Sequence, residues 1–321
     1  MSERVSVALC THQGERWIAE QLHSILAQTR QVDEIVVGDD ASTDRTLDIV
    51  RQVASETDVP FRIRRHEAAL GVAENFADAI AATTGDVVAL SDQDDVWHAD
   101  RIERLLPRLD GVALVHSNAR LVDATGAPLG STLEESLEMS AWERSALQEG
   151  RALDALLRRN LVTGATVLVR RDAALAALPI PSAWIHDEWL AMCAALGDGV
   201  RYEPEPTIDY RQHGGNAIGV ERLGAVGKLR RVLEPDSGKH AYKAQRAESL
   251  ATAAQHRGLA TGAMLERLIA KARHERARAA LPLPRALRLP GVVRGAAAGR
   301  YRTFSRGASD IARDLLESHG D

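Results

Sequence analysis

The sequence contains little cysteine and no long apolar run, and both shortages restrict the kind of protein it can form. Only two of its 321 residues are cysteines, Cys10 and Cys193, which excludes a small secreted fold held together by disulfides. No stretch of about 18 consecutive apolar residues occurs, so the sequence predicts no transmembrane helix. The first apolar stretch, residues 5–10, is too short for the core of a secretory signal. We therefore expect a cytosolic chain.

Several motifs of cofactor and metal chemistry are also absent. No GxGxxG follows an apolar run, which disfavours a dinucleotide-binding domain, and no GxxxxGK[ST] occurs, which disfavours a P-loop nucleotidase. No GxSxG is present to form the nucleophile turn of a hydrolase, and no CxxC pair is present to hold zinc. These classes of protein are therefore disfavoured.

Lysine is absent from the first 221 residues, and charge is unevenly distributed along the chain. That segment holds 20 arginines against 36 acidic residues, a net charge of −16, whereas residues 222–321 hold 20 basic and nine acidic residues, a net charge of +11. An acidic body argues against a nucleic-acid partner, because phosphate contacts need clustered cations. For the basic C-terminal region two interpretations stay open: a solvated helical face, which composition favours, and a face toward an anionic surface.

The first 220 residues alternate short apolar runs with helical patterns, which is typical of β-α-β units. Strands are expected at 5–10, 34–37, 61–65, 87–90, 112–116, 165–169, 200–203 and 207–210, and helices at 16–28, through 47–50, and at 72–82, 100–106, 153–160 and 186–196. Residues 123–150 are expected to be irregular. Beyond residue 219 the chain is predicted to be helical, with breaks at Pro235, Pro282, Pro284 and Pro290. The predicted fold class is α/β, with a mostly parallel central sheet, flanking helices and a C-terminal helical extension.

The strongest local signal is the segment SDQDDVW at residues 91–97. Its carboxylates Asp92, Asp94 and Asp95 directly follow an apolar run that predicts a buried strand. Two such charges about 4 Å apart repel by about 4 kcal/mol at an effective dielectric constant of about 20. A divalent cation would relieve this repulsion, and the carboxyl ends of central parallel strands are where open α/β sheets bind ligands. The alternative is an acidic loop that caps the next helix, but Asp100 already suits that cap.

Two further acidic groups follow other predicted elements. Asp39 and Asp40 end the second strand, where a carboxylate can accept hydrogen bonds from a nucleobase or a ribose; an ordinary turn is the alternative. Asp187, in HDEW at residues 186–189, opens a helix and suits a general base, although a first-turn helix acid is the simpler explanation. Trp184 and Trp189 flank it, and exposed indoles beside a carboxylate suit stacking on a sugar ring.

The segment YRQHGGN at residues 210–216 follows the last predicted strand. Arg211 and His213 have side chains that suit a phosphate or a metal, since histidine is the commonest metal ligand. The paired glycines let the backbone approach a ligand closely. A solvated loop is the alternative, and this segment gains weight only together with the others.

Together these segments resemble the inverting family-two glycosyltransferases, which have the A-type nucleotide-sugar fold. The similarity runs from residue 5 to about residue 219. It rests on LCTHQGERWIAEQLHSILAQT at 9–29, VGDDASTDRT at 37–46, LGVAENF at 70–76, SDQDDVW, HDEW and YRQHGGN. The last three forms look most like those of bacterial rhamnosyltransferases that build surface polysaccharide.

The resemblance implies a role for each matching position. The residues that would bind the nucleotide-sugar donor are Thr11, Asp39, Asp40, Asp92 and Arg211. Those that would hold a divalent cation, Mn²⁺ or Mg²⁺, are Asp94, Asp92 and His213. Asp187 would be the catalytic base, and the residues on the acceptor side would be Trp184, Glu188 and Trp189. Two positions depart from the family pattern: Glu188 replaces an aromatic residue, and His12 replaces a tyrosine or phenylalanine.

The resemblance therefore predicts a metal-dependent inverting glycosyltransferase. It would move a sugar, with L-rhamnose from dTDP-rhamnose as the first choice, from a nucleoside-diphosphate sugar to a saccharide or lipid-linked acceptor in surface polysaccharide synthesis. Residues 1–220 would be the catalytic domain, with a nucleotide-sugar half at about 1–118 and an acceptor half at about 119–220. Two alternatives stay open: a nucleotidyltransferase that makes sugar nucleotides, and a non-catalytic module that binds them.

Residues 221–321 would form a basic, mainly helical region. As a hypothesis, this region holds a cytoplasmic enzyme against the inner face of the cell membrane, where lipid-linked acceptors reside, while oligomer contact or plain helix packing is the competing view. The residues that would supply the charge are Lys228, Arg230, Arg231, Arg294, Arg300, Arg302 and Arg306.

Overall fold

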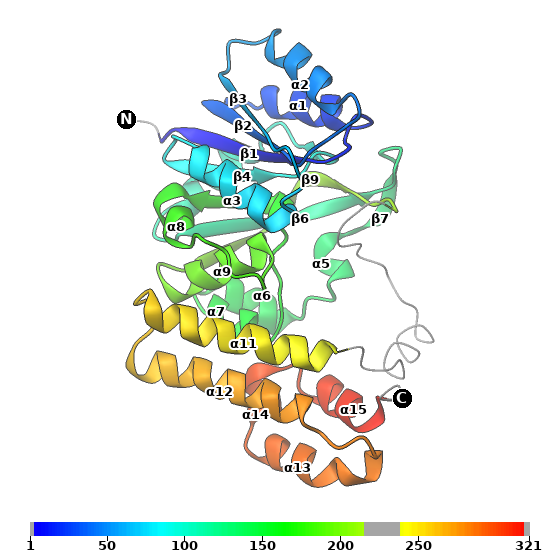
Figure 1. Ribbon diagram of the computed structural model, residues 1–321, viewed down its shortest axis with the longest axis vertical. Coiled ribbons are helices and arrows are strands. Elements are labelled where there is room, and N and C mark those ends of the chain that lie inside the picture. Colours follow the sequence, from blue (N-terminus) through cyan, green and yellow to red (C-terminus); the bar gives the residue numbers. More distant parts are fainter. Residues whose placement is uncertain (1–2, 215–237, 318–321) are drawn as a thin grey trace. The chain divides into compact units, whose positions relative to one another are not determined.

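The structure of the protein is a computed structural model that describes residues 3–214 and 238–317 (Figure 1). The chain folds as two compact units, Met1–Ala152 with Leu161–Val220, and Leu153–Asn160 with Glu221–Asp321. Some predicted features lie outside the described residues: the Gly215–Asn216 end of YRQHGGN, the break at Pro235, and the basic residues Lys228, Arg230 and Arg231.

Four parallel strands form the first half of the central sheet. In chain order they are β1 (Val5–Thr11), β2 (Glu34–Asp39), β3 (Phe61–Arg65) and β4 (Val87–Ser91). They lie side by side in the order β3-β2-β1-β4. Thr11 is paired with Asp39, and Leu9 with Ser91, so the carboxyl ends of β1, β2 and β4 meet at one edge of the sheet. The polar segments that follow these strands are therefore brought together.

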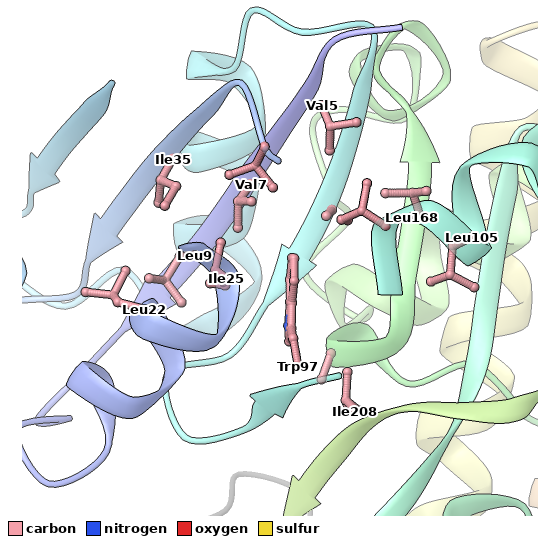
Figure 2. Packing of buried hydrophobic residues seen from close by; sticks show 14 of the residues in the cluster. Val5, Val7, Leu9, Leu22, Ile25, Ile35, Trp97, Leu105, Leu168 and Ile208 are labelled. Carbon is pink, nitrogen blue, oxygen red and sulfur yellow. The ribbon is translucent and has the colours of Figure 1, made fainter. Parts of the chain in front are cut away.

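Helices cover both faces of this parallel half. They are α1 (Ile18–Leu26), α2 (Thr46–Ala54) and α3 (Val72–Ala82). Right-handed crossovers place α1 and α2 on one face and α3 on the other. Figure 2 shows Leu22 and Ile25 of α1 beside Leu9 of β1, and all three side chains are fully buried. Burial of each such side chain contributes about 1.5–3 kcal/mol, which makes this layer a firm base for the loops at the sheet edge.

The second half of the sheet mixes parallel and antiparallel pairs. Its strands are β8 (Val167–Arg170), β6 (Leu114–Val122), β9 (Val200–Arg211), β5 (Val96–Trp97) and β7 (Pro128–Thr132). β8 runs antiparallel to β4 and β6, and β9 runs parallel to β6 but antiparallel to β5. The predicted α/β class, with its central sheet and C-terminal helical region, is confirmed. Among the described strands, parallel pairing is limited to β1 through β4 and to the β6–β9 pair.

The structure corrects two predicted segments. Residues 123–150 are not irregular but hold β7, α5 (Leu133–Ser136) and α6 (Ala141–Gln148). Each of these helices begins at a reciprocal capping box, a local signal that hydrophobic periodicity overlooks. The two short strands predicted at 200–203 and 207–210 are a single strand, β9. The remaining helices of four or more residues described before residue 214 are α4 (Arg101–Leu105), η1 (Leu106–Leu109), α7 (Ala152–Leu156), α8 (Arg171–Ala176) and α9 (His186–Leu196).

The C-terminal unit is helical, as predicted. Its helices are α11 (Lys239–His256), α12 (Gly262–Ala279), α13 (Leu289–Ala297), α14 (Arg300–Phe304) and α15 (Ala308–Leu316), and α11 packs along α12 (Figure 1). A buried ionic group joins three of them: the Arg278 guanidinium is 2.7 Å from the Asp314 carboxylate, which also accepts a 2.6 Å hydrogen bond from the Tyr301 hydroxyl. Within the ranges that the structure describes, no helix combines the length and apolar character needed to cross a membrane.

Candidate active site

The acidic loop after β4 is fixed at both ends by strand pairing. Its beginning follows Ser91, the buried last residue of β4, and its end is the short strand β5. Val96 of β5 pairs with Asp209 of β9. This antiparallel pair brings the loop against the residues that follow β9, and so joins the predicted segments SDQDDVW and YRQHGGN, which lie more than one hundred residues apart in the sequence.

Asp94 and His213 meet directly across this junction. The Asp94 Oδ2 and His213 Nε2 atoms are 2.8 Å apart, and both side chains are largely buried. The His213 ring stacks on Trp17, with ring centroids 4.1 Å apart and planes 18° from parallel. Trp17 precedes α1, and its position in the helical pattern of the sequence predicts a core side chain, so sequence reasoning misses its contact with His213. The stack fixes the plane of the imidazole that faces Asp94.

The buried Arg211 makes hydrogen bonds that position the acidic loop. Its Nε donates a 2.7 Å hydrogen bond to the Asp94 carbonyl, its Nη2 donates a 2.7 Å hydrogen bond to Glu20 Oε2, and its backbone N–H donates to Asp95 Oδ1 at 3.0 Å. The Arg211 side chain is only 2% exposed. Arg211 thus positions the acidic loop, and its contact with the donor stays a prediction.

The carboxylates of the site are crowded. Burial first, and then the nearby charges of Asp94 and Asp187, raise the pKa of Asp92 to about 8. Burial also raises the pKa of Asp95 well above its usual value, with Asp94 and Asp92 adding to the effect. The pKa of Tyr210 in β9 is raised first by burial and then by the charges of four acids, which are Asp95, Asp92, Asp94 and Asp187. Asp92, Asp94 and Asp187 therefore converge on one site.

Asp187 arrives at this site through α9 and β8. Because β8 is antiparallel to β4, the turn that precedes β8 lies beside the carboxyl end of β4, where Asp92 follows. Gly164 in that turn donates a 2.9 Å backbone hydrogen bond to Asp187 Oδ2, and the Glu188 backbone N–H donates a 2.6 Å hydrogen bond to Asp187 Oδ1. The first-turn position that the sequence predicts for Asp187 is confirmed, and its carboxylate is oriented by two backbone donors.

His186, the residue before Asp187, is packed against α3. Its ring stacks on Phe76 of α3, with centroids 3.9 Å apart and planes 16° from parallel. Burial lowers the pKa of His186, which favours the neutral ring, and neither ring nitrogen has a hydrogen-bond partner among the described residues. A Cβ atom on Gly164 would lie 2.6 Å from His186 Nε2, so only glycine fits this close approach. Sequence reasoning did not predict the contacts among Gly164, His186 and Phe76.

The segment after β2 is largely occupied by hydrogen bonds within the protein. Asp39 is fully buried, and its two oxygens accept hydrogen bonds from the Thr11 hydroxyl at 2.8 Å and from the Ser42 N–H at 3.0 Å. Asp39 therefore ties β1 to β2 through Thr11, and the nucleoside contact of these two residues stays a prediction. Asp40 is 7% exposed and accepts backbone hydrogen bonds from Leu70 and Gly71. It fixes the beginning of α3 at the same sheet edge.

Two glutamines link the loops that follow β1, β2 and β4. The Gln93 amide pairs with both backbone groups of His12, accepting from its N–H at 2.8 Å and donating to its carbonyl at 2.9 Å. Gln13 has a left-handed backbone, with φ 51°, and its side-chain oxygen accepts from the backbone N–H groups of Thr43 and Asp44. Sequence reasoning assigned no role to Gln93. The structure makes it the link between the acidic loop and the loop after β1.

The predicted acceptor side is corrected in part. Trp189 is fully buried, and its Nε1 donates a 2.7 Å hydrogen bond to the Ala177 carbonyl, so it cannot stack on a sugar. Trp184 packs against it with ring centroids 5.5 Å apart and is 9% exposed. The two indoles belong to the packing of α9. Glu188, next to Asp187, is half-buried and stays a prediction.

The side-chain donor atoms at this site suit a divalent cation whose remaining coordination positions are filled by a ligand. Within the described part of the chain, no three His, Cys, Asp or Glu side chains are grouped closely enough to form a metal site by themselves. The pair formed by Asp94 and His213 supplies two donors. Mg²⁺ is commonly bound by one or two carboxylates together with substrate phosphates, so this partial set fits such a cation.

The fold is that of the A-type glycosyltransferases. Residues 6–152 match the family model described as glycosyl transferase family 2, the family that the motifs of the sequence resemble. TarS of Staphylococcus aureus, solved with UDP-GlcNAc, superimposes with a TM-score of 0.54 at 18% identity over 98% of this chain and 90% of that one. A mannosyltransferase of Pyrobaculum calidifontis, solved with GDP-Man and Mn²⁺, gives a TM-score of 0.52 at 20% identity over 98% and 86%. These two likenesses confirm the fold.

Among curated relatives, an uncharacterized protein of Mycobacterium bovis is 27% identical over 217 residues, which is 65% of this chain and 59% of that protein. The chain thus spans less than two thirds of the length of this relative. A dTDP-rhamnosyl transferase of Shigella flexneri is 27% identical over 242 residues, covering 68% of this chain and 78% of that protein.

Proposed function

We propose that this protein is an inverting glycosyltransferase that uses a nucleoside-diphosphate sugar. The family match over residues 6–152 and the A-type fold support this class of reaction. The observation that carries the proposal is electrostatic: Asp187 lies close enough to Asp92 and Tyr210 for its charge to raise the pKa of both groups. The acid that suits a general base and the acidic loop that suits a diphosphate therefore face one site.

In the proposed mechanism Asp187 is the general base. The backbone N–H groups of Gly164 and Glu188 orient its carboxylate. Asp187 takes the proton from an acceptor hydroxyl while that oxygen attacks the anomeric carbon opposite the departing diphosphate, and a single displacement inverts the configuration. Asp94 and His213 would hold a divalent cation, which when bound neutralises charge on the diphosphate. Arg211 and Gln93 keep the acidic loop in place while Asp40 orders the loop before α3.

The proposals for the donor and the acceptor come from the sequence motifs and from one relative. We propose L-rhamnose carried by dTDP as the donor, because the forms SDQDDVW and HDEW are rhamnosyltransferase-like and because a dTDP-rhamnosyl transferase is among the relatives. A saccharide or lipid-linked acceptor in cell-surface polysaccharide synthesis would accept the sugar. We further propose that residues 1–220 form the catalytic domain, and that the enzyme works in the cytoplasm at the inner face of the membrane.

The test replaces Asp187 by Asn in the full chain. We expect release of nucleoside diphosphate in the presence of acceptor to fall by about 10²–10⁴-fold, the usual contribution of a general base. Stabilisation by the donor should survive, at about 2.7 kcal/mol for a hundredfold excess over the dissociation constant. Asp172→Asn is the matched control, because Asp172 is an exposed acid in the first turn of α8.

Three outcomes would contradict the proposal. Near-normal turnover of the Asp187→Asn variant would remove Asp187 as the base. Consumption of a nucleoside triphosphate and sugar phosphate by the wild type would indicate a nucleotidyltransferase. Donor binding with no transfer to any saccharide or lipid-linked acceptor would indicate a binding module.

A further inference from the structure

We propose that an arginine-flanked apolar face on the C-terminal helical unit binds the surface of an anionic lipid bilayer. What we call the apolar face is the set of exposed apolar side chains within residues 283–293, namely Leu283, Leu287, Leu289 and Val293, which are 68%, 62%, 54% and 54% exposed. Soluble monomers seldom expose large apolar side chains in such a cluster, and where they do the cluster commonly marks a site of interaction. The inference deepens the proposed membrane location, but it rests on a surface outside the candidate active site.

The fold directs these side chains outward. Val292 and Arg288 are each 1% exposed and point into the unit, where α13 packs against α12, α14 and α15. The Arg288 guanidinium donates hydrogen bonds of 2.7 and 2.8 Å to the carbonyls of Pro282 and Leu283, which fixes the segment that leads into α13. Leu289 and Val293 are four residues apart in α13 and so lie on the same side of the helix. Buried polar contacts of Arg288 therefore fix the chain segment that carries the exposed apolar side chains.

The charge around this face has one sign. Residues 276–309 contain eight arginines and no acidic residue. The arginines of this stretch that are exposed and have no carboxylate partner among the described residues are Arg285, Arg294, Arg300 and Arg302. The exposed Arg276 and Arg306 are paired with Glu248 and Asp310. Arg273, which lies outside this stretch, is also exposed and has no carboxylate partner among the described residues. Most of the exposed, unpaired arginines described in this unit thus lie in the same stretch of chain as the exposed leucines.

A bilayer surface matches both features at once. Apolar side chains enter the boundary between headgroups and acyl chains, while arginines beside them contact anionic headgroups. A nucleic acid would use the arginines but leave the leucines in water. α13 has nine residues, too few to span a bilayer, so it would lie on the surface rather than cross it. We therefore assign this face to anionic lipid.

The experiment is flotation of the full chain with vesicles of phosphatidylcholine, with and without phosphatidylglycerol. We expect binding to the anionic vesicles and little binding to the neutral ones, with binding weakened by salt because the Debye length shortens. Arg294→Gln/Arg300→Gln should lower the partition coefficient by about 30-fold, at about 1 kcal/mol per arginine near such a surface. Leu287→Ser/Leu289→Ser should lower it at least tenfold, by removing apolar groups that enter the membrane.

Leu129→Ser/Arg273→Gln is the matched control, because both residues are exposed but lie outside this face, and it should bind as the wild type does. The proposal is overturned if anionic vesicles are not bound, if neutral vesicles are bound equally, or if the leucine variant binds normally. Turnover with a water-soluble acceptor is measured in parallel. Loss of vesicle binding with retained turnover separates a failure of this surface from a failure of the proposed transferase activity.

Discussion

Replacing Gly164 by alanine tests whether the support behind Asp187 sets its position. The added Cβ would lie 2.6 Å from His186 Nε2 and 3.4 Å from Asp187 Cβ. Relaxed contacts between such atoms are about 3.5 Å or longer, so the His186 ring or the turn has to move by about 1 Å. The ring cannot easily yield, because it is buried and stacked on Phe76. The displacement is therefore transmitted to Asp187, which follows His186 and accepts a hydrogen bond from Gly164.

A misplacement of about 1 Å at a reacting group commonly costs about 10²-fold in rate. We expect Gly164→Ala to lower kcat by that factor, to leave stabilisation by the donor nearly unchanged, and to lower the free energy of unfolding by about 1–3 kcal/mol through overpacking. The assay is release of nucleoside diphosphate at saturating donor, with unfolding by urea measured on the same samples. Gly197→Ala is the control, because Gly197 ends the same helix and its Cβ would meet only ordinary contacts at 3.6 and 3.8 Å.

Removing the ring that clashes supplies a second test of the same reasoning. In the double variant Gly164→Ala/His186→Ala the new Cβ has space, so turnover should recover relative to Gly164→Ala alone, and the two changes should not be additive. The reasoning is refuted if folded Gly164→Ala turns over like the wild type. It is also refuted if Gly197→Ala loses as much activity, since the loss would then report only a weakened α9.

Three other predictions address the loops, the cation and the core. Gln93→Ala should raise the KM for the donor more than it lowers kcat, because it releases the loop after β1 from the acidic loop. The control Gln52→Ala, at an exposed site of α2, should change neither constant. Equal kinetics of the two variants would contradict the link between the loops. His213→Ala should lower the apparent affinity for Mn²⁺ with nucleoside diphosphate at least tenfold, as measured by thermal stabilisation, because the cation loses one of its expected ligands. An unchanged titration would remove His213 from the site. Burial lowers the pKa of His116 to about 3, so the folded state binds fewer protons than the unfolded state below pH 6.5 and stability is lost as the pH falls. Urea unfolding should show about 2 kcal/mol less loss between pH 7 and pH 5 for His116→Gln than for the wild type, and parallel pH profiles would contradict this.

Local signals were sufficient for the elements of the parallel half. The apolar runs before Thr11, Asp39 and Ser91 are strands whose ends align, as the sequence predicts. The acidic loop and the first-turn position of Asp187 follow from the same signals. Strand pairing in the mixed half of the sheet was harder to predict from the sequence, because the antiparallel pairing of β8 with β4 and of β5 with β9 depends on contacts between distant segments. The helices within 123–150 were missed although their capping boxes are local.

Residue roles within the site depended most on tertiary contacts. Arg211 and Trp189 have the residue types of ligand contacts, but each is buried and committed to hydrogen bonds with distant backbone. Gln93 carries no charge and attracted no attention, yet its amide joins two loops. Burial and partner cannot be read from the type of a side chain, since they depend on which other segment packs against it.

The sequence by itself determined the chemistry that this protein has available: an acidic loop after a buried strand, an acid at the start of a helix, a basic C-terminal region, and the resemblance of residues 6–152 to the family-two glycosyltransferases. Only the tertiary structure decided which of these groups meet. Hydrophobic periodicity sets strands and helices locally, whereas the approach of Asp187 to Asp92 requires β8 to pair with β4 and Gly164 to leave room for His186. The active-site candidates are a property of that packing, because a carboxylate becomes a base or a ligand only through the neighbours that the fold brings to it.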